Sequence, residues 1–254
     1  MKVVRAISEL RLEGEVGLVP TMGALHAGHV SLFDAARAEN DVVVVSLFVN
    51  PAQFDDRADL ARYPRDEERD FAVAEGAGVD VLFAPTPDEM YPAGFSTWVV
   101  PEETGAEGSA RPGHFRGVAT VCVKLFAIVR PARAYFGQKD ARQAIVVRRM
   151  ARDLNMGVDV RVLPTVRDED GLALSSRNVL LSPAERERAL GLPRALESAV
   201  GAPDPVAAAR AQLNGLDPDY IELLDLDGAT VLAAAVRVGS TRLIDNVVVK
   251  GALS

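Results

Sequence analysis

The run at 42–49, VVVVSLFV, constrains the fold more than any other segment, because one polar side chain interrupts eight residues. A strand without a polar face is typical of a parallel sheet that helices cover on both sides. Strand-like and helical patterns alternate around this run. The predicted strands are 16–20, 42–49, 79–83, 134–137 and 158–163, and the predicted helices are 29–39, 65–76, 117–129 and 141–153. This alternation predicts a Rossmann-like α/β fold, a doubly wound parallel sheet that binds ligands beyond the carboxyl ends of its strands.

The pattern changes after about residue 166. The segment 197–216 is rich in alanine, and the runs 220–226, 230–238 and 242–249 alternate or are β-branched. Such runs predict a small antiparallel sheet. We therefore expect a first domain at 1–165 and a second, smaller α+β C-terminal domain at 166–254.

The charge and cysteine content exclude several classes of protein. A formal charge of −8 and a pI of about 5.0 argue against binding to nucleic acid, although a local basic pocket can still hold a small anion. The single cysteine, Cys122, indicates a reducing compartment and is expected to fill the core of an apolar helix. No apolar run approaches the ~20 residues that span a bilayer. We expect a cytoplasmic protein with no membrane partner.

A histidine pair follows the first predicted strand of the sheet. His26 and His29 flank the turn H-A-G-H, where an apolar run passes into a helical pattern. Helix N-termini carry unpaired N–H groups that suit phosphate, and two imidazoles there can stabilise a phosphate as its bond breaks. The alternative is that both histidines are ordinary cap or surface residues. A zinc site is disfavoured, because no third Cys or His lies nearby in the sequence.

Three other segments carry polar side chains where a ligand is expected. Gln53 follows the strand-ending Pro51, and the alternative interpretation for it is a surface amide. His114 lies in the loop 111–117, which equally suits an anion site or a solvated turn. Lys139 lies at a predicted helix N-terminus, where the helix dipole disfavours a cation unless a phosphate is bound. For its neighbour Asp140, capping of the helix is the preferred interpretation over binding of ribose hydroxyls.

A further polar segment, 168–178, lies at the expected domain boundary. Ser175, Ser176 and Arg177 could close over a triphosphate, or the segment could be a linker that caps the next helix. Ser182 with Glu185 already supplies that cap, so the linker interpretation explains less of the pattern.

Five motifs occur in one order: PTMG with HAGH, FVNPAQF, RPGHF, FGQKD and DGLALSSRN. HAGH resembles the H-x-G-H signature of the nucleotidyltransferase superfamily. The full set resembles the pantoate–β-alanine ligase family over about residues 15–180, and more weakly at 241–246. The resemblance implies two steps. Pantoate attacks the α-phosphate of ATP to give pantoyl adenylate and pyrophosphate, and β-alanine then attacks the adenylate to give pantothenate and AMP.

The resemblance also implies site residues. The catalytic set is His29, as the proton donor, with His26, Lys139 and Arg177. The ATP-binding set is Pro20, Met22, Gly23, His26, Gly28, His29, Gly137, Gln138, Lys139, Asp140, Val166, Leu174, Ser175, Ser176 and Arg177. The substrate-binding set is Gln53, Gln143, Asn50, Tyr63 and His114. Magnesium accompanies ATP with unknown protein ligands, the C-terminal domain is a lid, the loop 174–177 is mobile, and the protein is a homodimer.

Several residues depart from the pattern of the family. Gln138 stands where the family usually has Glu, and Ala52, Ala141 and Arg142 also differ. The acidic residues after Tyr63 are shifted, with Arg69 between Glu67, Glu68 and Asp70. Two rival functions stay open on the residues alone. One is another small-molecule nucleotidyltransferase, which Gln53 and Gln143 disfavour. The other is a non-catalytic nucleotide-binding descendant, which His29, Lys139 and Arg177 disfavour.

Overall fold

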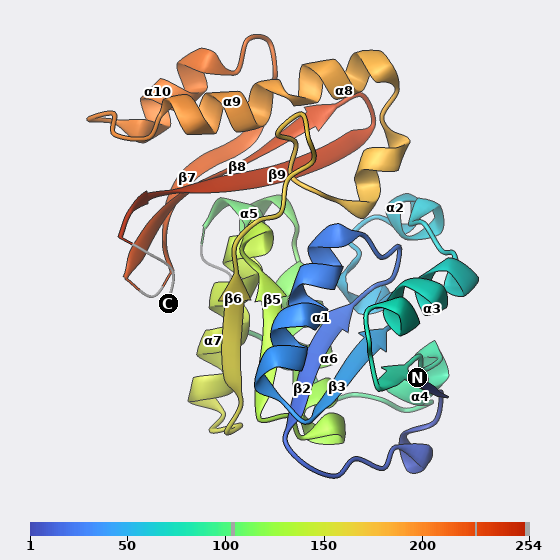
Figure 1. Cartoon of the computed structure of the whole chain (residues 1–254). Helices are drawn as coiled ribbons and strands as arrows, with labels where there is room; N and C mark the ends of the chain where they lie inside the picture. The colour runs from blue at the N-terminus through green and yellow to red at the C-terminus, as the bar shows by residue number, and fades with distance from the viewer. Residues whose placement is uncertain (103–104, 227, 252–254) are drawn as a thin grey trace.

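The computed structural model describes residues 1–102, 105–226 and 228–251, and its first part is built on a six-stranded parallel sheet. The strand order is β1-β4-β3-β2-β5-β6 (Figure 1). The strands are β1 (Lys2–Val4), β2 (Val16–Thr21), β3 (Val42–Leu47), β4 (Val81–Phe83), β5 (Arg133–Gly137) and β6 (Asp159–Leu163). The predicted doubly wound fold is confirmed, and the five predicted strands are all present.

Helices cover both faces of this sheet. Helices α1 (Ala27–Glu39) and α3 (Glu67–Gly76) cover one face, and α6 (His114–Val129) and α7 (Ala141–Asp153) cover the other. The first part also contains the short helices α2 (Arg57–Arg62), α4 (Pro87–Met90) and α5 (Ala106–Ala110). Val43 and Val45 of β3 pack in the apolar cluster of α1 and α3, whereas Val44 packs in the cluster of α6 and α7. The central strand is therefore buried on both faces, as its composition predicts.

The C-terminal part contains the predicted antiparallel sheet. Its strands β7 (Pro218–Leu226), β8 (Ala229–Val238) and β9 (Thr241–Lys250) pair in the order β7-β8-β9. Helices α8 (Pro183–Ala189), α9 (Gly191–Ser198) and α10 (Pro205–Gln212) lie over the face that points away from the first sheet (Figure 1). The capping box of Ser182 and Glu185 is present at the start of α8, as predicted.

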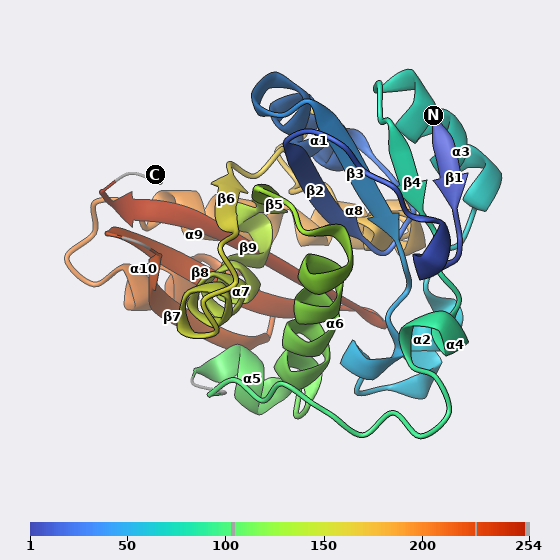
Figure 2. The same cartoon turned by 90° about the horizontal axis from the view of Figure 1, so that it is seen from below.

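The two parts share an apolar interface. Ala141 and Ala144 of α7, with Val162 of β6, pack in one cluster with Tyr220, Leu224 and other side chains of the antiparallel sheet. Figure 2 shows β7–β9 crossing beside α7 and the end of β5. The C-terminal sheet therefore carries an apolar layer on each face, one beneath α9 and one against the first sheet.

The order of the strands determines where a ligand is expected. From β2 the chain moves through β3 to β4 on one side, and then returns to place β5 on the other side of β2. Ligands of open parallel sheets bind at such a reversal, beyond the carboxyl ends of the strands. Among the described residues, no helix combines the length and the apolar character needed to cross a bilayer.

Candidate active site

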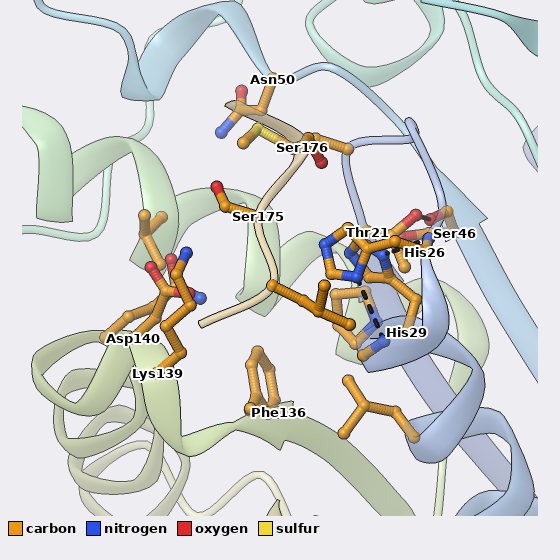
Figure 3. Close-up of a pocket in the computed structure, with 18 of the residues that line it drawn as sticks. Thr21, His26, His29, Ser46, Asn50, Phe136, Lys139, Asp140, Ser175 and Ser176 are labelled. Carbon is orange, nitrogen blue, oxygen red and sulfur yellow. Dashed lines mark hydrogen bonds between the residues drawn. The ribbon is translucent and has the colours of Figure 1, made fainter. Parts of the chain in front are cut away.

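A cavity lies at the strand-order reversal between β2 and β5, and residues of the C-terminal part, among them Ser175 and Ser176, line one side of it (Figure 3). Figure 3 shows Lys139 and Asp140 on one side, His26 and His29 on the other, and the segment of Ser175 and Ser176 between them. Most of the predicted site residues line it: Pro20, Met22, His26, Gly28, His29, Asn50, Gln53, Tyr63, Gly137, Lys139, Asp140, Gln143, Val166, Leu174, Ser175, Ser176 and Arg177. Gly23, Gln138 and His114 are absent from its lining.

The two histidines form a capping box at the start of α1. His26 is the N-cap, and its Nδ1 accepts from the backbone N–H of Gly28 at 3.2 Å. The Nδ1 of His29 accepts from the N–H of His26 at 3.3 Å, and the two ring centroids are 4.1 Å apart. The cap interpretation is thus correct for the local structure. Because each Nδ1 accepts a hydrogen bond, each neutral ring carries its proton on Nε2.

Burial keeps both imidazoles uncharged. Burial, followed by the nearby Lys139 ammonium, lowers the pKa of His26 to about 4. Burial, followed by His26, lowers the pKa of His29 to about 3. Each Nε2–H can therefore donate a hydrogen bond to an anion at neutral pH. A neutral imidazole of this kind acts as a hydrogen-bond donor, which differs from the role of proton donor that the resemblance implies for His29.

Asp70 of α3 holds the turn before the histidines. Its two carboxylate oxygens accept from the backbone N–H groups of Ala24 at 2.8 Å and Leu25 at 2.7 Å, and the residue is 2% exposed. Gly23 has φ +83°, and a Cβ there would lie 2.8 Å from Asp70 Oδ2. Gly23 therefore permits this turn rather than lining the cavity. The role of Asp70 was not predicted from the sequence, in which its partners are 45 and 46 residues away.

Gln53 is oriented by its neighbours at the end of β3. Asn50 Nδ2 donates to Gln53 Oε1 at 2.9 Å and to the carbonyl of Gly117 at 3.1 Å. Asn50 Oδ1 accepts from Ala52 N–H and from the Tyr91 hydroxyl. All four hydrogen-bonding positions of Asn50 are used, so it positions Gln53 rather than offering a free polar group. Gln53 lines the cavity, and with its Oε1 engaged by Asn50 its Nε2 remains as a donor for a ligand.

His114 also supports Gln53 and does not reach the cavity. Its Nδ1 lies 2.8 Å from the carbonyl oxygen of Gln53. Burial, with a smaller effect of the Arg111 guanidinium, lowers the pKa of His114 to about 4. The prediction of His114 as a direct substrate ligand is therefore corrected to a support for the 50–53 turn.

The segment after β5 departs from two predictions. Asp140 is the N-cap of α7 by position, but its side chain makes no capping hydrogen bond and lines the cavity instead. Gln138 points away from the cavity, and its Nε2 donates to Asn246 Oδ1 of β9 at 2.8 Å. The capping interpretation of Asp140 is thus wrong, binding of ribose hydroxyls stays a prediction, and Gln138 is a contact to the C-terminal sheet.

The loop 174–177 closes one side of the cavity. Ser176 Oγ donates to the carbonyl of Ala24 at 3.2 Å, which joins this loop to the histidine turn. Arg177 Nη2 pairs with Asp59 of α2 at 2.9 Å, and its guanidinium lies 5.7 Å from the ring of Tyr63. A guanidinium held at the rim of a cavity is placed to meet an anion inside it.

Apolar side chains of α6 form another wall of the cavity, together with Phe48 and Phe136. Cys122 belongs to this wall and is 3% exposed, and burial raises the pKa of its thiol to about 12. Its predicted place in the core is confirmed. Within the described ranges, no three His, Cys, Asp or Glu side chains gather to hold a metal ion.

The three histidines of the chain make stability sensitive to mild acid. Each has a folded pKa between about 3 and 4, below the unfolded value of 6.5. As the pH falls below 6.5, the histidines of the unfolded chain bind protons, whereas those of the folded chain stay neutral. We expect the free energy of unfolding to fall by about 1.2 kcal/mol per histidine between pH 7 and 5.5. Urea denaturation at both pH values measures this, and an unchanged midpoint would contradict it.

Comparison with known proteins identifies the family of this chain. The family model described as pantoate-beta-alanine ligase matches residues 1–248 of this chain. The chain belongs to the pantoate–β-alanine ligase family. Its histidine turn, its 50–53 turn, its 136–140 segment and its serine–arginine loop meet around one cavity.

Individual relatives agree with this assignment. A pantothenate synthetase of Roseiflexus sp. (strain RS-1) is 51% identical, over 98% of this chain and 100% of that protein. That of Moorella thermoacetica is 52% identical, over 92% and 91% respectively. The crystal structure of pantothenate synthetase from Thermus thermophilus superposes with a TM-score of 0.93 at 46% identity, over 99% of this chain and 100% of that one.

One solved relative was crystallised with ligands. The pantoate-beta-alanine ligase of Francisella tularensis is described as complexed with beta-gamma ATP and beta-alanine. It is 34% identical to this chain, covers all of both chains and has a TM-score of 0.85.

Proposed function

We propose that this ligase joins pantoate to β-alanine at the cavity between β2 and β5, with ATP cleaved to AMP and pyrophosphate. The observation that carries the proposal is the convergence on one cavity of His26, His29, Lys139 and Arg177 with the amides of Gln53 and Gln143. Cationic and N–H donors suit a triphosphate, and the paired amides suit a hydroxy acid. Family membership and the ligands of the Francisella relative support the same reaction.

In the first step, a pantoate carboxylate oxygen attacks the α-phosphorus of ATP. The bond to the bridging oxygen breaks, pyrophosphate leaves and pantoyl adenylate remains. Negative charge then grows on the phosphate oxygens. The Nε2–H groups of His26 and His29, the ammonium of Lys139 and the guanidinium of Arg177 would stabilise that charge, because preorganised donors need no rearrangement as the bond breaks. In the second step the amine of β-alanine attacks the adenylate, and AMP leaves.

The other predicted ligands divide between the two substrates. We assign Pro20, Met22, Gly28, Gly137, Asp140, Val166, Leu174, Ser175 and Ser176 to ATP, since they line the cavity beside the histidines or Lys139. We assign Gln53, Gln143 and Tyr63 to pantoate. The apolar wall of Phe48, Val118 and Leu125 suits the two methyl groups of pantoate.

Magnesium is proposed to arrive with ATP as part of that substrate. The fit of the residues to the ion is limited, because Asp140 is the one acidic side chain among the described residues of the cavity wall. Asp70 is already committed to two backbone N–H groups. Phosphate and water oxygens would therefore supply most of the ligands, as is usual for this ion. The metal would offset phosphate charge.

We further propose that 1–165 and 166–254 act as a catalytic domain and a cover for it. Separate apolar clusters support this division, one set inside the parallel-sheet part and one beneath α9 and α10. We also expect a homodimer in the cytoplasm. The dimer rests on the resemblance, and the cytoplasm on a chain with a single cysteine.

A product assay tests the proposed function. The purified protein is incubated with ATP, magnesium, pantoate and β-alanine, and AMP and pantothenate are measured together. Equal amounts of both are expected, with neither formed when pantoate is left out. Transfer of AMP to another acid would favour the rival nucleotidyltransferase. ATP binding without any product would favour the non-catalytic descendant.

Gly117 provides a test of the pantoate side of the cavity. A Cβ at Gly117 would overlap the carbonyl of Ala52 and lie 2.6 Å from the backbone nitrogen of Gln53. The turn of Gln53 must shift to admit it. We expect Gly117→Ala to weaken pantoate binding by about 1–3 kcal/mol, the usual result when a buried polar group loses its partner.

The matched control for this test is Gly76→Ala in α3, because a Cβ at Gly76 meets nothing within 4 Å. Calorimetry should show weaker pantoate binding in Gly117→Ala alone, and ATP affinity close to that of the wild type in both variants. Loss of ATP affinity with normal pantoate binding would mean that the two subsites are reversed.

A further inference from the structure

Asn246 of β9 contacts the segment that carries Lys139. Its Nδ2 donates to the carbonyl oxygens of Gln138 and Lys139, both at 2.9 Å. Its Oδ1 accepts from Gln138 Nε2 at 2.8 Å, and Asn246 is 2% exposed. Both amide hydrogens are therefore used on two successive backbone carbonyls, which fixes the orientation of the side chain because a carbonyl only accepts.

These hydrogen bonds determine the position of a cation in the cavity. Lys139 lies in the short 3-10 helix Gln138–Asp140 between β5 and α7, and no capping bond of Asp140 stiffens that turn. The Lys139 side chain lines the cavity, and its backbone carbonyl accepts a hydrogen bond from Asn246. The backbone from which the Lys139 ammonium projects is thus anchored by the C-terminal sheet.

The preceding residue of β9 holds the other cationic segment. Asp245 accepts from Arg167 Nη1 at 2.7 Å and from Nη2 at 3.1 Å, and its side chain is 1% exposed. Arg167 also donates to the carbonyl of Gly171 at 3.1 Å. The chain between Arg167 and Gly171 leads directly into the loop of Arg177. Two successive residues of one strand therefore anchor the segments of both Lys139 and Arg177.

We propose that Asn246 and Asp245 are positioning residues of the ligation reaction, with Asn246 acting through Lys139 and Asp245 through the Arg167 segment. This rests on the proposed function. A cation that stabilises departing pyrophosphate must be positioned accurately, since a displacement of about 1 Å can reduce the rate about 100-fold. The antiparallel sheet would then serve as the rigid support that sets the distance between the two phosphate-binding segments.

Asn246→Asp tests the proposal with little change in size. It keeps an acceptor for Gln138 Nε2 and removes both donations to backbone carbonyls. We expect single-turnover formation of pantoyl adenylate to slow by about 10- to 100-fold. The attack of β-alanine on supplied pantoyl adenylate, which releases no pyrophosphate, should slow far less. If Asn246→Asp does not fold, Asn246→Ala removes the same donors without adding a charge.

A double-mutant cycle with Lys139→Ala separates positioning from general support of the fold. If Asn246 acts through Lys139, Asn246→Asp should change the adenylation rate by no more than about twofold when Lys139 is already alanine. An equal loss of rate in both backgrounds would overturn the proposal.

Glu222→Gln is the matched control. Glu222 of β7 pairs with Arg142 of α7 at 3.0 Å, so its loss weakens the same interface without touching the carbonyls of residues 138 and 139. Its melting temperature should fall while its adenylation rate stays near that of the wild type, and an equal slowing would count against positioning. Calorimetric ATP titration of each variant needs no turnover. If the wild-type protein binds ATP but forms no adenylate, the proposed function is wrong. If it forms adenylate, the double-mutant cycle decides whether Asn246 positions Lys139.

Discussion

Replacing His29 by alanine is expected to slow formation of pantoyl adenylate by about 100-fold or more, the usual result of removing a preorganised donor. His29 lines the cavity, and its Nε2 carries the proton because its Nδ1 already accepts from the N–H of His26. Rapid-quench measurement of adenylate in a single turnover gives the rate. The fold should lose about 1 kcal/mol, because the ring also completes the cap of α1.

The pH dependence distinguishes a hydrogen-bond donor from an acid. With the pKa of His29 lowered to about 3, the wild-type adenylation rate should show no loss that follows a deprotonation near pH 6.5. His29→Gln carries an amide N–H at a similar reach and should recover part of the rate lost in His29→Ala. If the wild-type adenylation rate fell as the pH rose through 6.5, and the rate of His29→Gln did not change, His29 would act as a proton donor after all.

Arg177→Ala is expected to slow adenylate formation strongly and to leave the second step much nearer the wild-type rate. Charge builds on the β- and γ-phosphates as pyrophosphate leaves, so a cation that meets them there stabilises the transition state more than bound ATP. The attack of β-alanine on the adenylate releases AMP alone. Supplying pantoyl adenylate and β-alanine directly isolates that second step.

Asp59→Asn is the control for Arg177. It removes the ion pair between Asp59 and Arg177, at 2.9 Å, and keeps the guanidinium itself. Its adenylation rate should stay within about threefold of the wild type, because a partly exposed ion pair contributes about 1 kcal/mol or less and the asparagine amide oxygen can still accept from the guanidinium. Equal slowing of both steps in Arg177→Ala would assign the loop a general covering role and remove its role toward pyrophosphate.

The fold was largely predictable, because burial leaves a periodic trace in the sequence. The run 42–49 identified the central strand, and the β-branched runs after residue 220 identified the antiparallel sheet. The elements of the first part that were not predicted are short: β1 has three residues, and α2, α4 and α5 have six, four and five. Segments of this length carry too few apolar positions to show a period. Helix α6 begins three residues before its predicted start, because Gly113 adopts φ +82° ahead of it.

The roles of the site residues toward the substrates stay predictions. Their placement at the cavity was predictable where the polar side chain lies in the motif itself, as for His26, Lys139 and Gln53. It was not predictable where a polar side chain could face either of two neighbours. Capping of α7 by Asp140 and the predicted contact of Gln138 with ATP each depend on the direction of one side chain, and the long-range partner Asn246 decides the direction for Gln138. Asp70 and Asn246 were missed because their partners lie 46 and 108 residues away in sequence.

The buried thiol of Cys122 makes this chain a convenient host for spectroscopic labels. It is the only cysteine of the sequence, it is 3% exposed, and its pKa of about 12 keeps it protonated. The thiolate is the nucleophile that attacks an alkylating reagent, so the native protein should stay unmodified under ordinary alkylating conditions. A cysteine placed at an exposed position, such as Val179 near the serine–arginine loop, would then be the single reactive group. Fluorescent or spin probes could follow that loop during turnover without first removing a native thiol.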